Sequence, residues 1–122
     1  MQSKKKKRNC PFVTLYVSAS SNNTQLVAAE NGNVVAWSSA GSAGFKGAKK
    51  STPHAASEAT NAFLDKLREM GVKTANLILK GIFPGRDAAL KVLTGSGIAI
   101  QKITDKTGFA FNGCRQKGRR RV

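Results

Sequence analysis

The stretch TPHAASEATNAFLDKLREMGVKTANLILK, residues 52–80, decides the fold, because its pattern changes from that of a helix to that of a strand. Thr52 is a suitable N-cap, and Pro53 suits the first helical position, where no backbone N–H is needed. Apolar residues at helical spacing then predict one buried stripe, and Gly71 supplies a left-handed stop. The stripe consists of Ala56, Ala59, Phe63, Leu67 and Met70.

The end of this stretch, residues 74–80, predicts a strand. Its run Leu77-Ile78-Leu79 is apolar on both faces, as in parallel sheets that are covered by helices above and below. We therefore expect helices on both faces of the sheet at this strand. A shorter helix over 84–94, ended by Gly95, and a last strand over 98–103 follow.

The residues before this stretch predict an antiparallel meander. Residues 13–20 (VTLYVSAS) alternate between apolar and polar, as a half-buried strand does. Two further strands over 25–30 and 34–38 are joined across Asn31-Gly32-Asn33, which suits a tight hairpin. Residues 39–52 have no apolar periodicity and predict a loop.

These elements together predict a single α/β domain. Its sheet is mixed and five-stranded, with an antiparallel meander followed by βαβ-type units and two main helices. The predicted organisation is a basic N-terminal arm over 1–12, an α/β domain over 13–105 and a basic C-terminal tail over 106–122. Self-repulsion would keep both arms disordered in isolation.

Charge is the strongest compositional signal. Lys plus Arg is 21 and Asp plus Glu is 6, which gives a formal net charge of +15. Residues 1–12 hold five basic groups and residues 106–122 hold six, and neither segment contains an acid. Two such arms favour a polyanionic partner, because neutralised phosphates release condensed counterions. The longest apolar runs are far shorter than a membrane span, so we expect no membrane association.

The sequence lacks the residues that enzymatic or cofactor chemistry requires. Residues 47–51 are out of register with a nucleotide P-loop, and a single histidine, His54, with two separate cysteines, Cys10 and Cys114, gives little material for a metal site. A ribonuclease H-type nuclease needs clustered carboxylates in the sheet, and the first predicted strand has no acid. We expect no catalytic residue, no cofactor, no metal and no small-molecule substrate. The cysteines are expected to be free thiols.

Basic and small residues gather in segments outside the predicted core. The loop 38–53 (SSAGSAGFKGAKKSTP) and the helix start 81–86 (GIFPGR) both offer backbone amides and basic groups to phosphate. Phe45 would either stack on a base or anchor the loop. The candidate RNA-binding residues are Lys4, Lys5, Lys6, Lys7, Arg8, Ser38, Ser39, Lys46, Lys49, Lys50, Arg86, Asn112, Arg115, Lys117, Arg119, Arg120 and Arg121.

Four segments in order resemble one known family. They are residues 37–56 (WSSAGSAGFKGAKKSTPHAA), 85–89 (GRDAA), 112–115 (NGCR) and 119–122 (RRRV), and together they look like the small-subunit ribosomal protein S-eleven family. The resemblance implies a ribonuclease H-like sheet on the platform of the small subunit. It also implies binding to small-subunit ribosomal RNA near the exit-site path of messenger RNA, with neighbouring ribosomal proteins as partners.

The C-terminal part departs from the usual family pattern. Thr107-Gly108, Phe111 and Gln116-Lys117 stand where members usually have Thr-Pro, a histidine and a Pro-Pro pair. Such drift favours the ribosome of an organelle, with the mitochondrial matrix as the first expectation and the bacterial cytoplasm as the alternative. Two other functions remain in competition: a nucleic-acid-binding module outside the ribosome, and a divergent nuclease.

The dipeptide Asn112-Gly113 is a candidate for isoaspartate formation. Glycine leaves the following backbone nitrogen unhindered, so it can attack the asparagine side chain and close a succinimide. The same dipeptide occurs at Asn31-Gly32, where a tight hairpin would hold the nitrogen away from attack geometry. The competing interpretation is a simple turn at 112–113 whose amide binds RNA.

Overall fold

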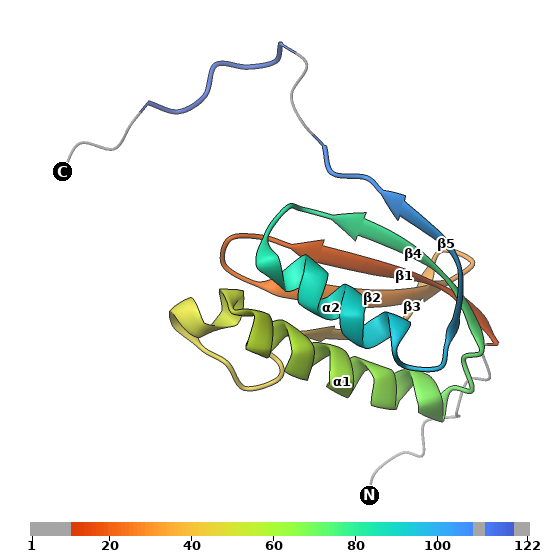
Figure 1. Ribbon diagram of the computed structural model, residues 1–122. Helices are drawn as coiled ribbons and strands as arrows, with labels where there is room; N and C mark the ends of the chain where they lie inside the picture. Colours follow the sequence, from red (N-terminus) through yellow and green to blue (C-terminus); the bar gives the residue numbers. More distant parts are fainter. Residues whose placement is uncertain (1–10, 109–111, 119–122) are drawn as a thin grey trace, which may run out of the picture.

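The computed structural model describes residues 11–108 and 112–118, which contain one mixed sheet and two main helices (Figure 1). The strands lie side by side in the order β3-β2-β1-β4-β5. They are β1 (Phe12–Ala19), β2 (Thr24–Glu30), β3 (Asn33–Ser39), β4 (Thr74–Lys80) and β5 (Ala99–Asp105). The helices are α1 (Pro53–Glu69) and α2 (Pro84–Thr94), with a short 3-10 helix, η1 (Gly47–Ser51), before α1. The predicted α/β fold is confirmed, and η1 lies within the predicted loop.

The first three strands form the predicted antiparallel meander. β1 pairs with β2 and β2 pairs with β3, both antiparallel. The turn between β2 and β3 places Asn31 at φ 51° and Gly32 at φ 83°, which is the backbone shape of a two-residue hairpin turn. A register shift between Ala28 and Ala29 gives the β2–β3 pair a bulge.

The second half of the sheet is parallel, with β4 beside β1 and β5 beside β4. Each new parallel strand is added on the same side of the previous one, so right-handed crossovers place both helices on one face. Figure 1 shows α1 and α2 together on that face, and the two helices contact each other. The expectation of helices on both faces was therefore wrong. Leu77 and Leu79 are buried beneath the helices, whereas Ile78 points to the opposite face and is half-buried.

The core lies between the helices and the sheet. Alternate residues of β1 are almost fully buried, as their spacing predicted, and they belong to the same core cluster as the buried residues of α1. Alanines in the first half of α1 are completely buried, which allows the helix to lie close to β2 and β3. The principal contributors are Val13, Leu15, Val17, Leu26, Ala59, Phe63, Leu67, Leu77, Ala89 and Leu93.

Both ends of α1 follow the sequence prediction. The Thr52 hydroxyl accepts a hydrogen bond from the Ala55 N–H at 3.2 Å, and Pro53 occupies the first helical position. Gly71 follows the helix with φ 69°. The last strand extends two residues beyond its predicted end, because it continues pairing with β4 up to Asp105.

The sheet reaches into both predicted arms. Phe12 belongs to β1, and the Pro11 carbonyl accepts hydrogen bonds from Lys73 and Thr74 N–H at 3.0 Å each. At the other end, the Lys106 N–H donates to the Leu79 carbonyl at 2.8 Å. Residues 1–10, 109–111 and 119–122 lie outside the described residues, as does the predicted disorder of those parts of the arms. Of the helices in the described ranges, none has the length and apolar character that crossing a membrane requires.

Candidate nucleic-acid interface

The loop between β3 and η1 is held by its own backbone. The Ala40 N–H donates to the Thr24 carbonyl at 3.1 Å, and the Ala40 carbonyl accepts from the Phe45 N–H at 3.2 Å. The Ala43 N–H donates to the Ser39 carbonyl at 3.1 Å. Ala40 is completely buried. The glycine- and serine-rich segment is therefore an ordered turn attached to the sheet.

The two serines predicted to contact RNA have different environments. Ser38 is buried, and its hydroxyl donates to the Ala59 carbonyl of α1 at 3.0 Å, so its polar group is used inside the domain. Ser39 is half-buried and exchanges hydrogen bonds with Ser42 in both directions, at 2.9 and 3.1 Å. The structure thus places Ser38 in the interior and Ser39 at the base of the loop.

Phe45 anchors the loop to the start of α1. Its ring meets the His54 ring edge-to-face, with centroids 5.7 Å apart and an interplanar angle of 86°. Phe45 is half-buried, whereas His54 is exposed. Of the two interpretations of Phe45, anchoring is the one that its contacts favour.

Three lysines are presented by η1 and the residue before it. Lys46 and Lys49 are exposed, and Lys50 is half-buried. Thr52 fixes this segment to α1, because its hydroxyl donates to the Lys49 carbonyl at 2.8 Å while it caps the helix. The three lysines therefore lie on or next to a short helix that is hydrogen-bonded to the domain, which lowers the entropy lost when they bind phosphate.

Arg86, the basic residue at the start of α2, bonds within the domain. Its Nη1 donates to the Gly81 carbonyl at 2.8 Å and to Asp105 Oδ2 at 2.9 Å. The Arg86 side chain is 24% exposed. Its guanidinium thereby joins the β4–α2 turn to the end of β5, a structural task that the basic pattern of residues 81–86 did not reveal.

Thr107 completes this cluster, which we call the tail clamp and define as Gly81, Arg86, Asp105 and Thr107. The Gly81 N–H donates to Thr107 Oγ1 at 3.1 Å, and Thr107 donates from its hydroxyl and its N–H to Asp105 Oδ1 at 2.6 and 2.9 Å. These bonds from Thr107, followed by the contact with Arg86, hold the pKa of Asp105 below its ordinary value. The Asp-x-Thr spacing was the available signal, since aspartate often accepts from the N–H two residues later.

The described part of the tail, residues 112–118, is exposed throughout. Arg115 and Lys117 are therefore available to a partner, and Cys114 is an exposed free thiol. Asn112 lies at φ 54°, so it occupies a turn conformation. The predicted contacts at Lys4 to Arg8 and at Arg119 to Arg121 lie outside the described residues.

The carboxylates do not form a metal site. Glu58, Asp65 and Glu69 are exposed on α1, and β1 carries no acid. In residues 11–108 and 112–118, no three His, Cys, Asp or Glu side chains are grouped so that they could hold a metal ion.

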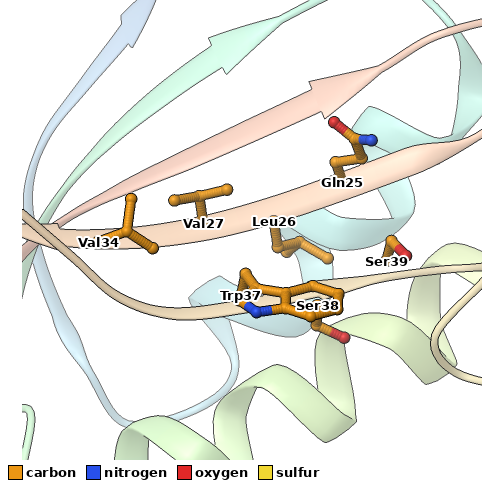
Figure 2. A pocket seen from close by; sticks show the side chains of 7 residues that line it. All are labelled: Gln25, Leu26, Val27, Val34, Trp37, Ser38 and Ser39. Carbon is orange, nitrogen blue, oxygen red and sulfur yellow. The ribbon is translucent and has the colours of Figure 1, made fainter.

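A pocket of about 320 Å³ lies beside β2 and β3. Figure 2 shows its lining, in which Trp37 of β3 is paired with Val27 of β2. No basic residue contributes to the lining, so the pocket does not have the chemistry of a phosphate site. The full set is Gln25, Leu26, Val27, Val34, Trp37, Ser38 and Ser39.

Comparison with known proteins matches nearly the whole chain to one family. The family described as Ribosomal protein S11 matches residues 13–121. The small ribosomal subunit protein uS11c of Aneura mirabilis is 42% identical over 123 residues, which covers 100% of this chain and 95% of that protein. The uS11 proteins of Hamiltonella defensa and Borreliella burgdorferi (strain ZS7) are 42% and 43% identical over 120 residues, covering 98% of this chain and 93% and 92% of theirs.

The match extends over nearly the whole chain and includes both the loop that carries the three lysines and the tail. The match supports the ribosomal function over the two competing functions, a nuclease and a nucleic-acid-binding module outside the ribosome. The chain therefore belongs to the ribosomal protein S11 family, whose members are structural components of the small ribosomal subunit and not enzymes.

Proposed function

We propose that this protein binds small-subunit ribosomal RNA on the platform, near the exit-site path of messenger RNA, alongside neighbouring ribosomal proteins. The ribosome would be that of an organelle, with the mitochondrial matrix favoured over the bacterial cytoplasm. The observation that carries the RNA-binding part is the absence of acids from two basic segments. The loop over 38–53 and the described tail over 112–118 contain lysine or arginine residues but no Asp or Glu.

The proposed RNA contacts fall into two groups. Lys46, Lys49 and Lys50 on the loop, with Ser39 at its base, would bind phosphate, since compact ammonium groups and hydroxyls serve this purpose. Asn112, Arg115 and Lys117 would bind along the tail. Lys4 to Arg8 and Arg119 to Arg121, which lie outside the described residues, are proposed as further RNA contacts. Arg86 and Ser38 would act indirectly, because their polar groups already have partners within the domain.

Cys114 provides a handle for testing the placement. A Cys10→Ser chain carries a single thiol, and an iron chelate attached to Cys114 would generate hydroxyl radicals at the tail. In assembled small subunits, we expect cleavage of the small-subunit RNA and of a bound messenger RNA. Cleavage of the ribosomal RNA without the messenger RNA would contradict the exit-path placement, and cleavage of neither RNA would contradict the function as proposed.

Removal of residues 109–122 is expected to weaken assembly into the small subunit and to leave the domain folded. The core closes without these residues, and the tail clamp remains intact because it ends at Thr107. A shorter chain ending at residue 105 should lose about 2 kcal/mol of stability, at about 1 kcal/mol for each of the bonds of Lys106 to Leu79 and of Thr107 to Gly81 that disappear. Thermal unfolding and sedimentation with small subunits measure the two effects. Loss of cooperative unfolding in the chain ending at 108 would show that the tail is part of the core.

Any isoaspartate is expected at residue 112 and not at residue 31. Both asparagines lie at positive φ, 54° and 51°, but Asn31 is held in the hairpin by the pairing of Glu30 with Asn33, whereas Asn112 lies in the exposed tail. Isoaspartate would add a negative charge among the arginines. Peptide mapping with an isoaspartate-specific methyltransferase, with Gly113→Val as control, measures it. Label at residue 31 alone, or at neither site in aged ribosomes, would favour the simple turn.

A further inference from the structure

The face of the sheet turned away from α1 and α2, which we call the open face, carries an apolar row. Strand pairing aligns Trp37 of β3, Val27 of β2, Tyr16 of β1 and Ile78 of β4 in one line across the sheet, ending at Thr104 of β5. In the described part of the chain, both helices cover only the other face (Figure 1). The row is therefore left uncovered by the domain itself.

Large apolar side chains on this face are well exposed. Trp37 is 58% exposed and Tyr16 is 42% exposed within the row, and Val34 in the neighbouring row is 61% exposed. Phe12, paired with Thr74, adds a fourth at 43%. Single exposed apolar residues are common, but several that adjoin on one surface mark an interaction site.

The outer edge of β3 is unsuited to accept another strand. Lys66 Nζ from α1 donates to the Trp37 carbonyl at 2.7 Å, so a lysine occupies this backbone acceptor. The register shift, which leaves Val35 out of the pairing with β2, further interrupts the edge. The same ammonium lies 5.3 Å from the centroid of the Trp37 ring and fixes the indole beside the pocket shown in Figure 2. A partner would therefore bind onto the face and not along the edge.

The charges on the open face favour a partner that carries carboxylates. The charged residues at its paired positions are Lys80, opposite Ser18, and Lys102, opposite Asn76, and no acid occupies such a position. Lys66 adds a positive group at the β3 side. A partner that covers the row meets an apolar centre with ammonium groups at both ends.

The side chains at the centre of the row favour a protein partner over RNA. Platforms that bind single-stranded RNA stack bases on successive aromatic rings. Here Val27 separates Trp37 from Tyr16, and Ile78 follows, so aliphatic side chains occupy two of the positions. Aromatic and aliphatic residues without charges form the centre of protein–protein interfaces.

We propose that the open face binds a neighbouring protein of the small subunit, through an apolar segment flanked by acidic residues. Trp37 and Val34 would contact apolar side chains of that segment, while Lys80 and Lys102 would pair with its carboxylates. The proposal rests on the proposed place of the chain within the small subunit. It adds a protein contact on the face opposite α1 and α2.

A photo-crosslinking amino acid tests the proposal in assembled subunits. We would replace Tyr16 with p-benzoylphenylalanine in the full chain, with the same replacement at Asn61, an exposed residue of α1, as control. The expected result is a protein adduct at residue 16 whose peptide contains acidic and apolar residues, and no adduct to that protein at residue 61. An adduct to RNA, or none at residue 16, would overturn the proposal.

A second measurement tests the contacts on the two sides of the row. Val34→Glu places a carboxylate in the exposed apolar surface and should lower the yield of the residue-16 adduct by about tenfold, whereas Asn61→Glu should not change it. A carbodiimide should join Lys80 or Lys102 to the same partner. An unchanged yield with Val34→Glu would also overturn the proposal. If the iron chelate on Cys114 cleaves ribosomal RNA but residue 16 gives no protein adduct, only this inference is refuted. If the chain is absent from the small subunits, the proposed function is refuted.

Discussion

Replacing Gly81 with alanine is expected to lower the free energy of unfolding by at least about 4 kcal/mol. Gly81 lies at φ 96°, and a Cβ there would collide with the backbone carbonyl of Ala19 at the end of β1. The collision partner is main chain in the central strand, so it cannot rotate away. Any shift of Gly81 also breaks its bonds to Arg86 and Thr107. The substitution should therefore disturb the sheet and the tail clamp together.

Gly97→Ala is the matched control for this prediction. Gly97 has a similar φ of 87°, but an added Cβ would meet nothing within 4 Å. Its substitution should cost only the backbone strain, about 1–2 kcal/mol. Urea unfolding followed by circular dichroism measures both variants. Equal losses for the two glycines would show that φ alone decides the cost and that the Ala19 carbonyl moves freely.

Changing Lys46, Lys49 and Lys50 together to alanine is expected to reduce the salt dependence of RNA binding by about two to three units of slope. Each phosphate contact contributes roughly 0.7–0.9 to the slope of log K against log salt, and three contacts would be lost. Because η1 is fixed by Thr52, the loop itself should keep its shape without the ammonium groups. Filter binding to small-subunit RNA over a series of salt concentrations measures the slope.

A triple variant with the same change in net charge controls for non-specific attraction. Arg68, Lys73 and Lys91 are exposed and lie away from the loop, on α1, after it and on α2. Their change to alanine should leave the slope nearly unaltered. If both triple variants reduced the slope equally, the loop would have no special role. An unchanged slope for the loop variant would show that its lysines face solvent.

Local sequence signals were sufficient for most of the fold. Alternation along β1, the Asn31-Gly32 turn and the Thr52–Pro53 start of α1 each depend on residues close together in the chain, and the structure confirms all three. The face of the sheet on which the helices lie could not be predicted from local sequence signals. Leu77-Ile78-Leu79 indicates apolar surroundings on both sides of β4, but whether a helix or another protein covers the Ile78 side depends on strand order.

The candidate site residues also fall into those that the local sequence identifies and those that depend on contacts between distant segments. The loop lysines are identified by composition, and the structure places them on the exposed side of η1 or beside it. Arg86 looked equally suitable for phosphate because it begins a helix, yet its partner Asp105 is 19 residues away and becomes a neighbour only through the β4–β5 pairing. Ser38 is similar, because its bond to Ala59 spans the packing of α1 on β3. Contacts between distant segments decide which polar groups remain free for RNA.

The parallel pairing of β1 with β4 has a consequence for the synthesis of the protein. The central strand emerges early from the ribosome that makes it, but its partner begins at Thr74, about 60 residues after Phe12. At typical elongation rates of about 5–20 residues per second, one edge of β1 waits roughly 3–12 seconds for β4. From the end of β3 at Ser39 until β4 is made, the nascent chain holds a hairpin meander with an exposed apolar face and an unpaired edge, which is a target for chaperones. Translation speed over residues 40–73 therefore sets how long the newborn chain is open to aggregation.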